Sequence, residues 1–145
     1  YVGLDELYAC ADVITLHCNL TPENTGMINK SSIAKMKDGV ILVNTSRGGL
    51  VKTADLIEGI RARKFFAVGL DVYEEESEYF YEDQSDRIID DDVLARLLSF
   101  NNVIVTSHQA FFTREALENI ATTTLQNIKD FKSGKVSENE VKIQN

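Results

Sequence analysis

Short apolar runs alternate with amphipathic stretches along most of the chain. The apolar runs are rich in β-branched residues, and such runs bounded by polar residues predict buried strands. We place these strands at residues 12–16, 40–44, 65–70 and 103–105. Apolar positions at helical spacing predict helices at residues 4–8, 31–36, 53–60 and 90–99,.

This alternation of strand and helix predicts the fold class. Near-continuous apolar strands separated by helices indicate a parallel sheet covered on both faces, as in the doubly wound, Rossmann-like α/β class. Ser31 and Ser32 open the second helix and are suited to cap it,. In sheets of this class ligands bind beyond the carboxyl ends of the strands.

Two stretches depart from the alternation. Residues 113–132 have apolar positions near helical spacing throughout, which predicts one amphipathic helix about 30 Å long, enough to cross from one domain to another,. Half of residues 73–92 are acidic, and aromatic side chains are interspersed among them. Such a run is usually a solvated acidic loop, although the aromatic side chains suggest that part of it packs on something.

Composition and charge narrow the classes of partner. The chain has 145 residues, of which 43% are hydrophobic and 26% charged, as is ordinary for one globular domain,. Its longest apolar runs are far shorter than the roughly 20 residues of a membrane helix, and we expect no membrane partner. The net charge of −8 argues against a nucleic-acid partner,. These exclusions favour a small-molecule ligand.

Cysteine and histidine usage bears on metal binding and compartment. Cys10 and Cys18 lack the spacing of a metal knuckle or a redox pair, and we expect both to be reduced and semi-buried,. Neither H-E-x-x-H nor C-x-x-C occurs in the chain,, so we predict no metal. Without a basic, apolar leader or a framework of disulfides, the chain is expected to be cytoplasmic.

Three polar groups follow three of the predicted strands. Arg47 comes after the strand at 40–44, Asp71 after the strand at 65–70, and His108 after the strand at 103–105. An arginine can grip a carboxylate with two parallel hydrogen bonds, and an imidazole can transfer a proton. A carboxylate beside the imidazole favours its protonated form. The set suits redox chemistry on a 2-keto acid.

Each of these residues also has a structural interpretation. An arginine is ordinarily a surface ion-pair partner, and a lone histidine after a strand is more often a hydrogen-bonded structural residue than a catalyst. The combination at three strand ends favours function. Periodicity does not select the carboxylate partner of His108 among Glu74, Glu75 and Glu76.

The segments that carry this chemistry resemble a known family. The chain contains L-H-C-N-L-T-P-E-N-T, N-T-S-R-G-G-L-V, G-L-D-V-Y-E-E-E and S-H-Q-A-F. Together they resemble the D-isomer-specific 2-hydroxyacid dehydrogenases, most of all the fermentative D-lactate dehydrogenases of bacteria. The similarity runs from Leu4 to about Glu140 and corresponds to the second half of such an enzyme.

The resemblance implies catalytic and substrate-binding roles. The family's arginine in the S-R-G motif binds the substrate carboxylate and carbonyl, which implies Arg47. The family's histidine before Q-A-F is the acid/base, which implies His108. The family's catalytic glutamate stands five residues after the strand-ending aspartate, which implies Glu76. Phe111 would line the substrate or nicotinamide side.

The resemblance also implies NAD as cofactor. The family's strand-ending aspartate contacts the nicotinamide amide, which implies Asp71. Further cofactor contacts are implied at Cys18, Asn19, Asn24, Thr45 and Ser46. No G-x-G-x-x-G occurs in the chain, and in the family this phosphate-binding loop precedes the part that the chain resembles. We therefore expect the chain to be truncated at its amino terminus.

The expected organisation follows from that resemblance. Residues 1–112 would be the carboxyl-terminal part of an NAD-binding domain, and residues 113–145 a helix and tail that pack on a substrate domain. We expect interconversion of pyruvate and D-lactate by the full-length protein, inactivity of the 145-residue chain alone, and a homodimer. The alternatives are a dehydrogenase for a bulkier D-2-hydroxy acid and a non-catalytic NAD-sensing relative that resembles a corepressor.

Overall fold

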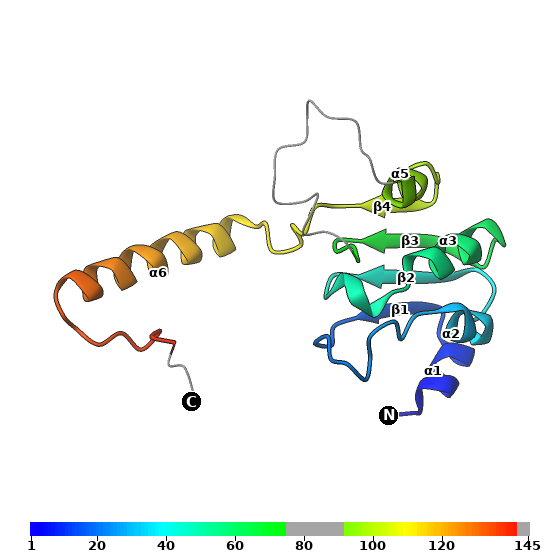
Figure 1. Ribbon diagram of the computed structural model, residues 1–145, viewed down its shortest axis with the longest axis horizontal. Coiled ribbons are helices and arrows are strands. Elements are labelled where there is room, and N and C mark those ends of the chain that lie inside the picture. Colours follow the sequence, from blue (N-terminus) through cyan, green and yellow to red (C-terminus); the bar gives the residue numbers. More distant parts are fainter. Residues whose placement is uncertain (75–91, 142–145) are drawn as a thin grey trace. The chain divides into compact units, whose positions relative to one another are not determined.

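The computed structural model describes residues 1–74 and 92–141 and divides the chain into two compact units (Figure 1). The first, Tyr1–Ala110, is called the sheet unit here, and the second, Phe111–Asn145, the helical unit. The division falls between Ala110 and Phe111, whereas the sequence predicts a boundary after residue 112. Among the described residues, no helix is both long and apolar enough to cross a bilayer.

The sheet unit is built on a four-stranded parallel sheet. Its strands are β1 (Val13–Leu16), β2 (Val40–Asn44), β3 (Phe65–Leu70) and β4 (Val103–Val105), in the spatial order β1-β2-β3-β4. All three pairings are parallel. The predicted parallel α/β architecture is confirmed, and the carboxyl ends of all four strands lie at the same edge of the sheet.

Four helices pack on this sheet in a row. They are α1 (Leu4–Cys10), α2 (Lys30–Lys35), α3 (Thr53–Arg61) and α5 (Asp92–Leu98), and a 3₁₀ turn, η1 (Gly48–Leu50), follows β2. Each helix contacts the next, α1 with α2, α2 with α3 and α3 with α5. All four contribute to one hydrophobic core with the same face of the strands.

The sequence predicts helices on both faces of the sheet, but the described helices of the sheet unit cover one. The opposite face presents Val13, which is 53% exposed, and Ile104, which is 71% exposed. Right-handed connections between strands that advance in one direction place every connecting helix on the same face. The predicted Rossmann-like class holds, and apolar patterning alone does not reveal on which face the helices of these four strands lie.

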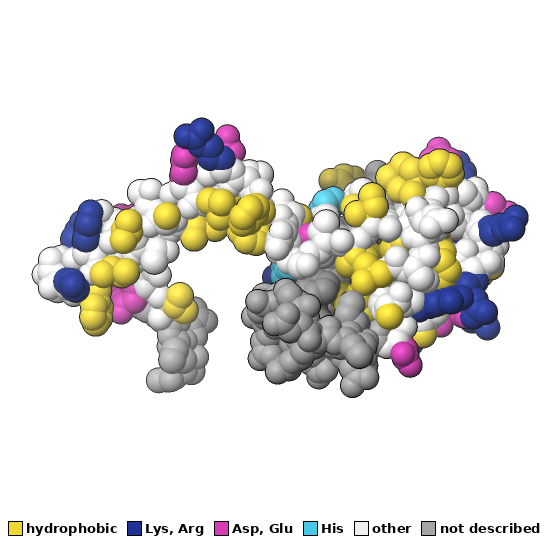
Figure 2. Space-filling model, turned by 90° about the horizontal axis from the view of Figure 1, so that it is seen from above, with side chains coloured by type: hydrophobic (Ala, Val, Ile, Leu, Met, Phe, Trp, Pro, Cys, Tyr) yellow, Lys and Arg dark blue, Asp and Glu magenta, His cyan; other side chains and the backbone are white. Residues whose placement is uncertain are grey.

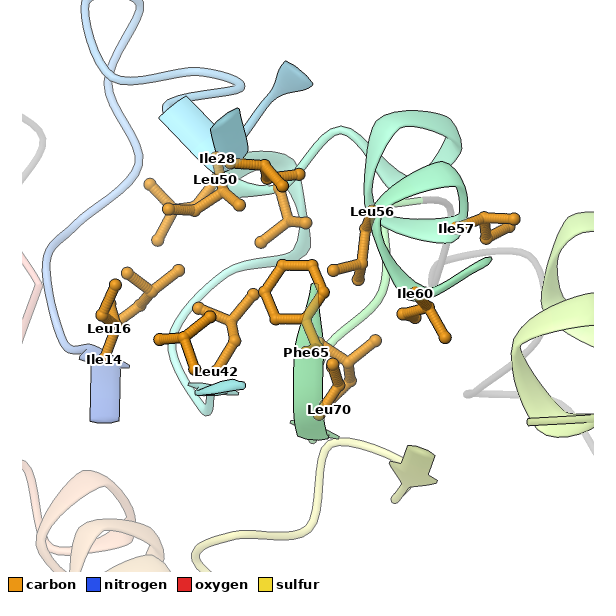
Figure 3. Packing of buried hydrophobic residues seen from close by; sticks show 14 of the residues in the cluster. Ile14, Leu16, Ile28, Leu42, Leu50, Leu56, Ile57, Ile60, Phe65 and Leu70 are labelled. Carbon is orange, nitrogen blue, oxygen red and sulfur yellow. The ribbon is translucent and has the colours of Figure 1, made fainter. Parts of the chain in front are cut away.

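The core lies between the helices and the covered face of the sheet (Figure 3). Leu42 and Phe65 extend from the strands, and Leu50 and Leu56 meet them from η1 and α3. A Cβ atom on Gly59 would lie 2.8 Å from the ring of Phe65. Glycine at this helix position therefore lets the aromatic ring pack directly on the α3 backbone.

The cap of α2 differs from the prediction. Asn29 is the capping residue, and its Oδ1 accepts hydrogen bonds from the backbone N–H groups of Ser31 and Ser32 at 2.9 and 3.2 Å. The Ser32 hydroxyl in turn accepts a hydrogen bond from the Asn29 backbone N–H, which completes a capping box,. Ser32 thus takes part in the cap from the first turn of the helix, and Ser31 does so only through its backbone.

The helical unit contains one long helix, α6 (Arg114–Lys132), close to the predicted range of 113–132. Thr113 caps its start by accepting a hydrogen bond from the Ala116 backbone N–H at 3.2 Å. No residue of α6 is buried. Hydrophobic side chains gather along the helix in Figure 2, and those at least 40% exposed are Leu117, Ile120, Leu125, Ile128 and Phe131.

Candidate active site

Arg47 lies in a tight turn between β2 and η1. The buried amide of Asn44, at the end of β2, donates from Nδ2 to the Arg47 carbonyl oxygen at 2.9 Å and accepts from the Ser46 N–H at 3.0 Å. The Arg47 guanidinium is exposed and donates to the Ser46 carbonyl oxygen at 2.7 Å. Within residues 1–74 and 92–141 it forms no salt bridge, which leaves its fork of donors accessible to an anionic ligand,.

Gly48 joins this turn to the segment that follows β3. A Cβ atom at Gly48 would lie 2.0 Å from the Tyr73 carbonyl oxygen and 2.6 Å from the Glu74 nitrogen. Glycine is therefore required for the two backbones to approach this closely. The Glu74 carboxylate accepts a hydrogen bond from the Thr53 N–H at 3.2 Å and fastens the same segment to the start of α3.

Asp71 and His108 belong to one hydrogen-bonded assembly at the ends of β3 and β4. The His108 N–H donates to the Asp71 carbonyl oxygen at 2.7 Å. The Asp71 carboxylate accepts the N–H groups of Gln109 and Ala110, each at 2.8 Å, and the Thr106 hydroxyl. Asp71 therefore holds the loop on both sides of His108 through its main chain and its side chain.

His108 has a left-handed backbone conformation, with φ of 53°. For a residue other than glycine this conformation is uncommon, and such residues cluster at functional sites. The hydrogen bonds from the loop to Asp71 stabilise the conformation. The half-buried His108 imidazole thus belongs to a loop whose backbone is fixed from a neighbouring strand.

The charge of Asp71 is maintained by its surroundings. Burial acts to raise the pKa of this carboxyl group, since only 4% of the residue is exposed,. The hydrogen bonds from Thr106, Ala110 and Gln109, with the charge of His108, outweigh burial and bring the pKa below its ordinary value. The group is therefore an ionised acceptor at neutral pH.

Hydrogen bonds also connect the loops after β1 and β2. The Ser46 hydroxyl donates to the Cys18 carbonyl oxygen at 2.5 Å. The Asn24 amide donates to the Asn19 carbonyl oxygen at 2.7 Å and to the Cys18 sulfur at 3.9 Å. Four of the five residues expected from these two loops to contact a cofactor thus form one network, and exposed Thr45 adjoins it in the chain.

Other expectations have different outcomes. Glu76 lies outside the described residues. Phe111 belongs to the helical unit, where it is 51% exposed and packs edge-on against Phe112 with ring centroids 6.2 Å apart. Cys10 and Cys18 are exposed and not semi-buried, because their side chains lie away from the core. In the described ranges no three His, Cys, Asp or Glu side chains are grouped as a metal site would require.

Sequence reasoning missed two polar residues of this site. Asn44 is fully buried, and Thr106 is the only side chain that donates to the Asp71 carboxylate within the described part of the chain. Asn44 looks like the last residue of a strand. A usable signal existed, because asparagine commonly accepts a hydrogen bond from the backbone two residues further on. Thr106 offers no comparable local signal.

Comparison with known proteins identifies the family. Residues 1–110 match the family model described as D-isomer specific 2-hydroxyacid dehydrogenase, NAD binding domain. A 2-hydroxyacid dehydrogenase homolog of Haemophilus influenzae is 57% identical over 141 residues, which are 97% of this chain and 43% of that protein. The D-lactate dehydrogenase of Escherichia coli is 47% identical, with the same shares covered.

A solved structure supports the same assignment. The D-lactate dehydrogenase of Treponema pallidum superimposes with a TM-score of 0.89 at 38% identity, over 99% of this chain and 43% of that one. The chain thus spans less than half the length of these relatives. The resemblance seen in the sequence is confirmed: the chain belongs to the D-isomer specific 2-hydroxyacid dehydrogenases and carries residues of their NAD-binding domain.

Proposed function

We propose that the full-length protein carrying this chain reduces pyruvate to D-lactate with NADH and catalyses the reverse reaction with NAD⁺. The observation that carries the proposal is the joining of three segments at one edge of the sheet. The Asp71 N–H donates to the Asn44 carbonyl oxygen at 2.9 Å, Gly48 packs on Tyr73, and the Asp71 carboxylate holds the loop of His108. The backbone segments that carry Arg47, after β2, and His108, after β4, are thereby both tied to the end of β3, which lies between these strands.

The residues at this edge fit the nicotinamide half of an NAD molecule. The nicotinamide carboxamide offers N–H donors, and the ionised Asp71 carboxylate is an acceptor with capacity beyond the three bonds it accepts,. We propose further contacts from the loop residues Cys18, Asn19, Asn24, Thr45 and Ser46. When bound, NADH supplies the hydride that reduces the substrate carbonyl carbon.

Arg47 would bind and orient the substrate. A guanidinium holds a carboxylate by two parallel N–H···O bonds, which fixes both the position and the direction of the attached keto group. The exposed guanidinium lies in a turn whose backbone is held by the buried Asn44 amide. Arg47 therefore combines an accessible charge with a fixed backbone, as substrate positioning requires.

His108 would move the proton. As the carbonyl carbon receives the hydride, negative charge develops on the carbonyl oxygen, and the protonated imidazole donates its proton there and becomes neutral. The same imidazole accepts the hydroxyl proton when D-lactate is oxidised. We propose that Glu76 favours the protonated imidazole and aligns it, as a neighbouring carboxylate does.

We also propose that the helical unit packs on a substrate domain of the full-length protein. Its helix α6 has five hydrophobic side chains at least 40% exposed and no buried residue. An apolar stripe of this kind is stable when another surface covers it. Phe111, at the start of this unit, would then line the substrate or nicotinamide side.

The two cysteines bear on the cellular compartment. Two exposed, unpaired cysteines suit a reducing compartment,, and we propose the cytoplasm. A homodimer stays a prediction, to be measured by light scattering on the full-length protein.

A panel of 2-keto acids with NADH tests the activity. We expect pyruvate to give the highest kcat/KM, and a preference for a bulkier acid would replace the substrate while keeping the reaction. Binding of NADH without turnover of any 2-keto acid would instead favour a non-catalytic NAD-sensing role.

Substitution of His108 tests the mechanism. We expect His108→Ala to lower kcat by roughly 100- to 10,000-fold, the usual contribution of a general acid. His108→Asn is the matched control, because asparagine tolerates the left-handed backbone conformation but cannot donate the same proton. Equal losses in both variants assign the effect to the imidazole. Near-normal turnover of His108→Ala would refute the proposed mechanism.

A further inference from the structure

We propose that Asn44 is a positioning residue for substrate binding, acting through the backbone of Arg47. The inference rests on the proposed function, because Arg47 is there assigned to the substrate carboxylate. Asn44 is 0% exposed, and its side-chain amide makes both of its bonds to the turn that carries Arg47. Its role is to fix the backbone position from which the Arg47 side chain extends.

The chemistry of the amide suits this task. Oδ1 accepts from the Ser46 N–H at 3.0 Å, and Nδ2 donates to the Arg47 carbonyl oxygen at 2.9 Å. One planar group therefore closes the turn from both directions. A hydroxyl or a carboxylate in the same place would lack either the reach or the donor.

The main chain of Asn44 is fixed independently of its side chain. Its carbonyl oxygen accepts the Asp71 N–H at 2.9 Å, which belongs to the pairing of β2 with β3. Asn44 thus binds the Arg47 turn through its side chain and Asp71, just after β3, through its main chain. Asp71 in turn holds the loop of His108. The backbone at Arg47 and the loop of His108 are therefore both positioned relative to β3.

The backbone position of Arg47 depends on the Asn44 side chain more than the position of Ser46 does. Ser46 has a second side-chain tether, because its hydroxyl donates to the Cys18 carbonyl oxygen at 2.5 Å. The Arg47 carbonyl oxygen accepts the Leu50 backbone N–H at 3.3 Å and the Asn44 amide at the shorter distance of 2.9 Å, and among the described residues Asn44 is the only side chain that binds it. Loss of the amide should therefore displace the substrate-binding cation more than the proposed cofactor contact at Ser46.

The test compares Asn44→Ala with Asn102→Ala in the full-length protein. Asn102 is a matched control, since its amide also donates to backbone carbonyl oxygens, those of Phe65 and Phe66 at 3.2 and 3.3 Å, but at the opposite edge of the sheet. We expect Asn44→Ala to lower kcat/KM for pyruvate by about 100-fold, as for a misplaced positioning group. Its KM for pyruvate should rise while its KM for NADH changes little.

Asn44→Ser provides rescue and guards against misfolding. Serine can still accept from the N–H two residues further on, though more weakly than asparagine, but it is too short to reach the Arg47 carbonyl oxygen. We expect an intermediate loss of kcat/KM, and this variant decides the question if Asn44→Ala does not fold. Equal kinetic losses in the Asn44 and Asn102 variants would overturn the proposal.

A structural readout separates this inference from the proposed function. If the wild-type protein reduces no 2-keto acid, the proposed function fails, and amide hydrogen exchange at Ser46 then decides the role of Asn44. Faster exchange in Asn44→Ala than in Asn102→Ala supports a positioned turn. Unchanged protection at Ser46 contradicts it.

Discussion

The two units of the chain differ in how far their side chains are buried within the unit. The sheet unit buries a continuous apolar core, and its buried polar residues Asn44 and Asp71 have hydrogen-bond partners. The helical unit has a helix of 19 residues with none of them buried. The first unit carries its own sources of stability within the chain, whereas the second presents an apolar surface that another surface would stabilise.

The sequence accordingly carries different information about the two units: contacts within the sheet unit, and an apolar face without a named partner in the helical unit. In the sheet unit, apolar residues are paired with neighbours from the same unit, and polar residues at the strand ends form the candidate site. In α6, the apolar spacing indicates a helix with a face to cover, but it does not name the partner. Substitutions of the same type in both units, compared by their free energies of unfolding, measure this difference.

The largest effect is expected from paired glycine substitutions. In Gly48→Ala the new Cβ would lie 2.0 Å from the Tyr73 carbonyl oxygen, a backbone atom that cannot rotate away. We expect a loss of about 3–5 kcal/mol in the free energy of unfolding, at the upper end for a single substitution.

Gly134→Ala in the helical unit is the matched control. Gly134 has φ of 68°, and a Cβ there meets nothing within 4 Å. The cost should be only that of the left-handed conformation, roughly 1–2 kcal/mol. Urea unfolding of the full-length variants measures both, and equal losses would show that the close approach at Gly48 does not limit stability.

Paired leucine substitutions are expected to come next. Leu42 on β2 is 0% exposed and Leu125 on α6 is 58% exposed. Leu42→Ala should cost about 2–5 kcal/mol through lost burial and a cavity. In the 145-residue chain Leu125→Ala should change stability by no more than about 0.5 kcal/mol, as surface substitutions usually do.

The same pair tests whether α6 is covered in the full-length protein. If a substrate domain packs on the helix, Leu125→Ala becomes destabilising there, and its cost approaches that of Leu42→Ala. Thermal unfolding of both variants in both lengths of protein gives the answer. A Leu125→Ala effect that stays small in the full-length protein would contradict the proposed packing.

The sequence predicted most of the fold because its strands are short, apolar and rich in β-branched residues. Strand β2, for example, lies at residues 40–44 as expected. The sequence did not predict that the described helices cover one face, because that depends on strand order and handedness. The capping residue Asn29 was missed because Ser31 and Ser32 offered a competing choice of the same chemical type.

The candidate site was predictable where function depends on a strand end. Arg47, Asp71 and His108 follow three strands, and the parallel pairing of β2, β3 and β4 brings their segments to one edge. Thr106 was missed because its hydrogen-bond partner, the Asp71 carboxylate, becomes a neighbour only through folding. Asn44 was missed although its partners lie two and three residues further along the chain, because its position at the end of an apolar run indicates a strand residue. The catalytic roles, that of Glu76 included, stay predictions.

The smallest effect concerns pH and distinguishes buried from exposed carboxylates. The folded-state pKa of Asp71 lies below the ordinary value of 3.8. Its ionised form therefore stabilises the fold above that value, and the contribution is lost as the pH falls through the lower, folded-state pKa. Thr106→Val removes one donor, so the pKa of Asp71 should rise and the acid-induced loss should begin at higher pH.

Two controls complete this measurement. Thr106→Ser keeps the hydroxyl donor and should retain the wild-type acid limb, whereas Thr106→Val should lose about 1.5–3 kcal/mol at neutral pH, the usual worth of a hydrogen bond to a charged group. On α6, Glu118→Gln removes an exposed ion pair with Arg114 and should hardly change the profile,. Unfolding free energies measured from pH 7 to pH 3 test all three variants. If Thr106→Val and Glu118→Gln gave the same acid limb, the buried carboxylate would not be what makes the sheet unit acid-sensitive, and the contrast between the units would rest on apolar packing alone.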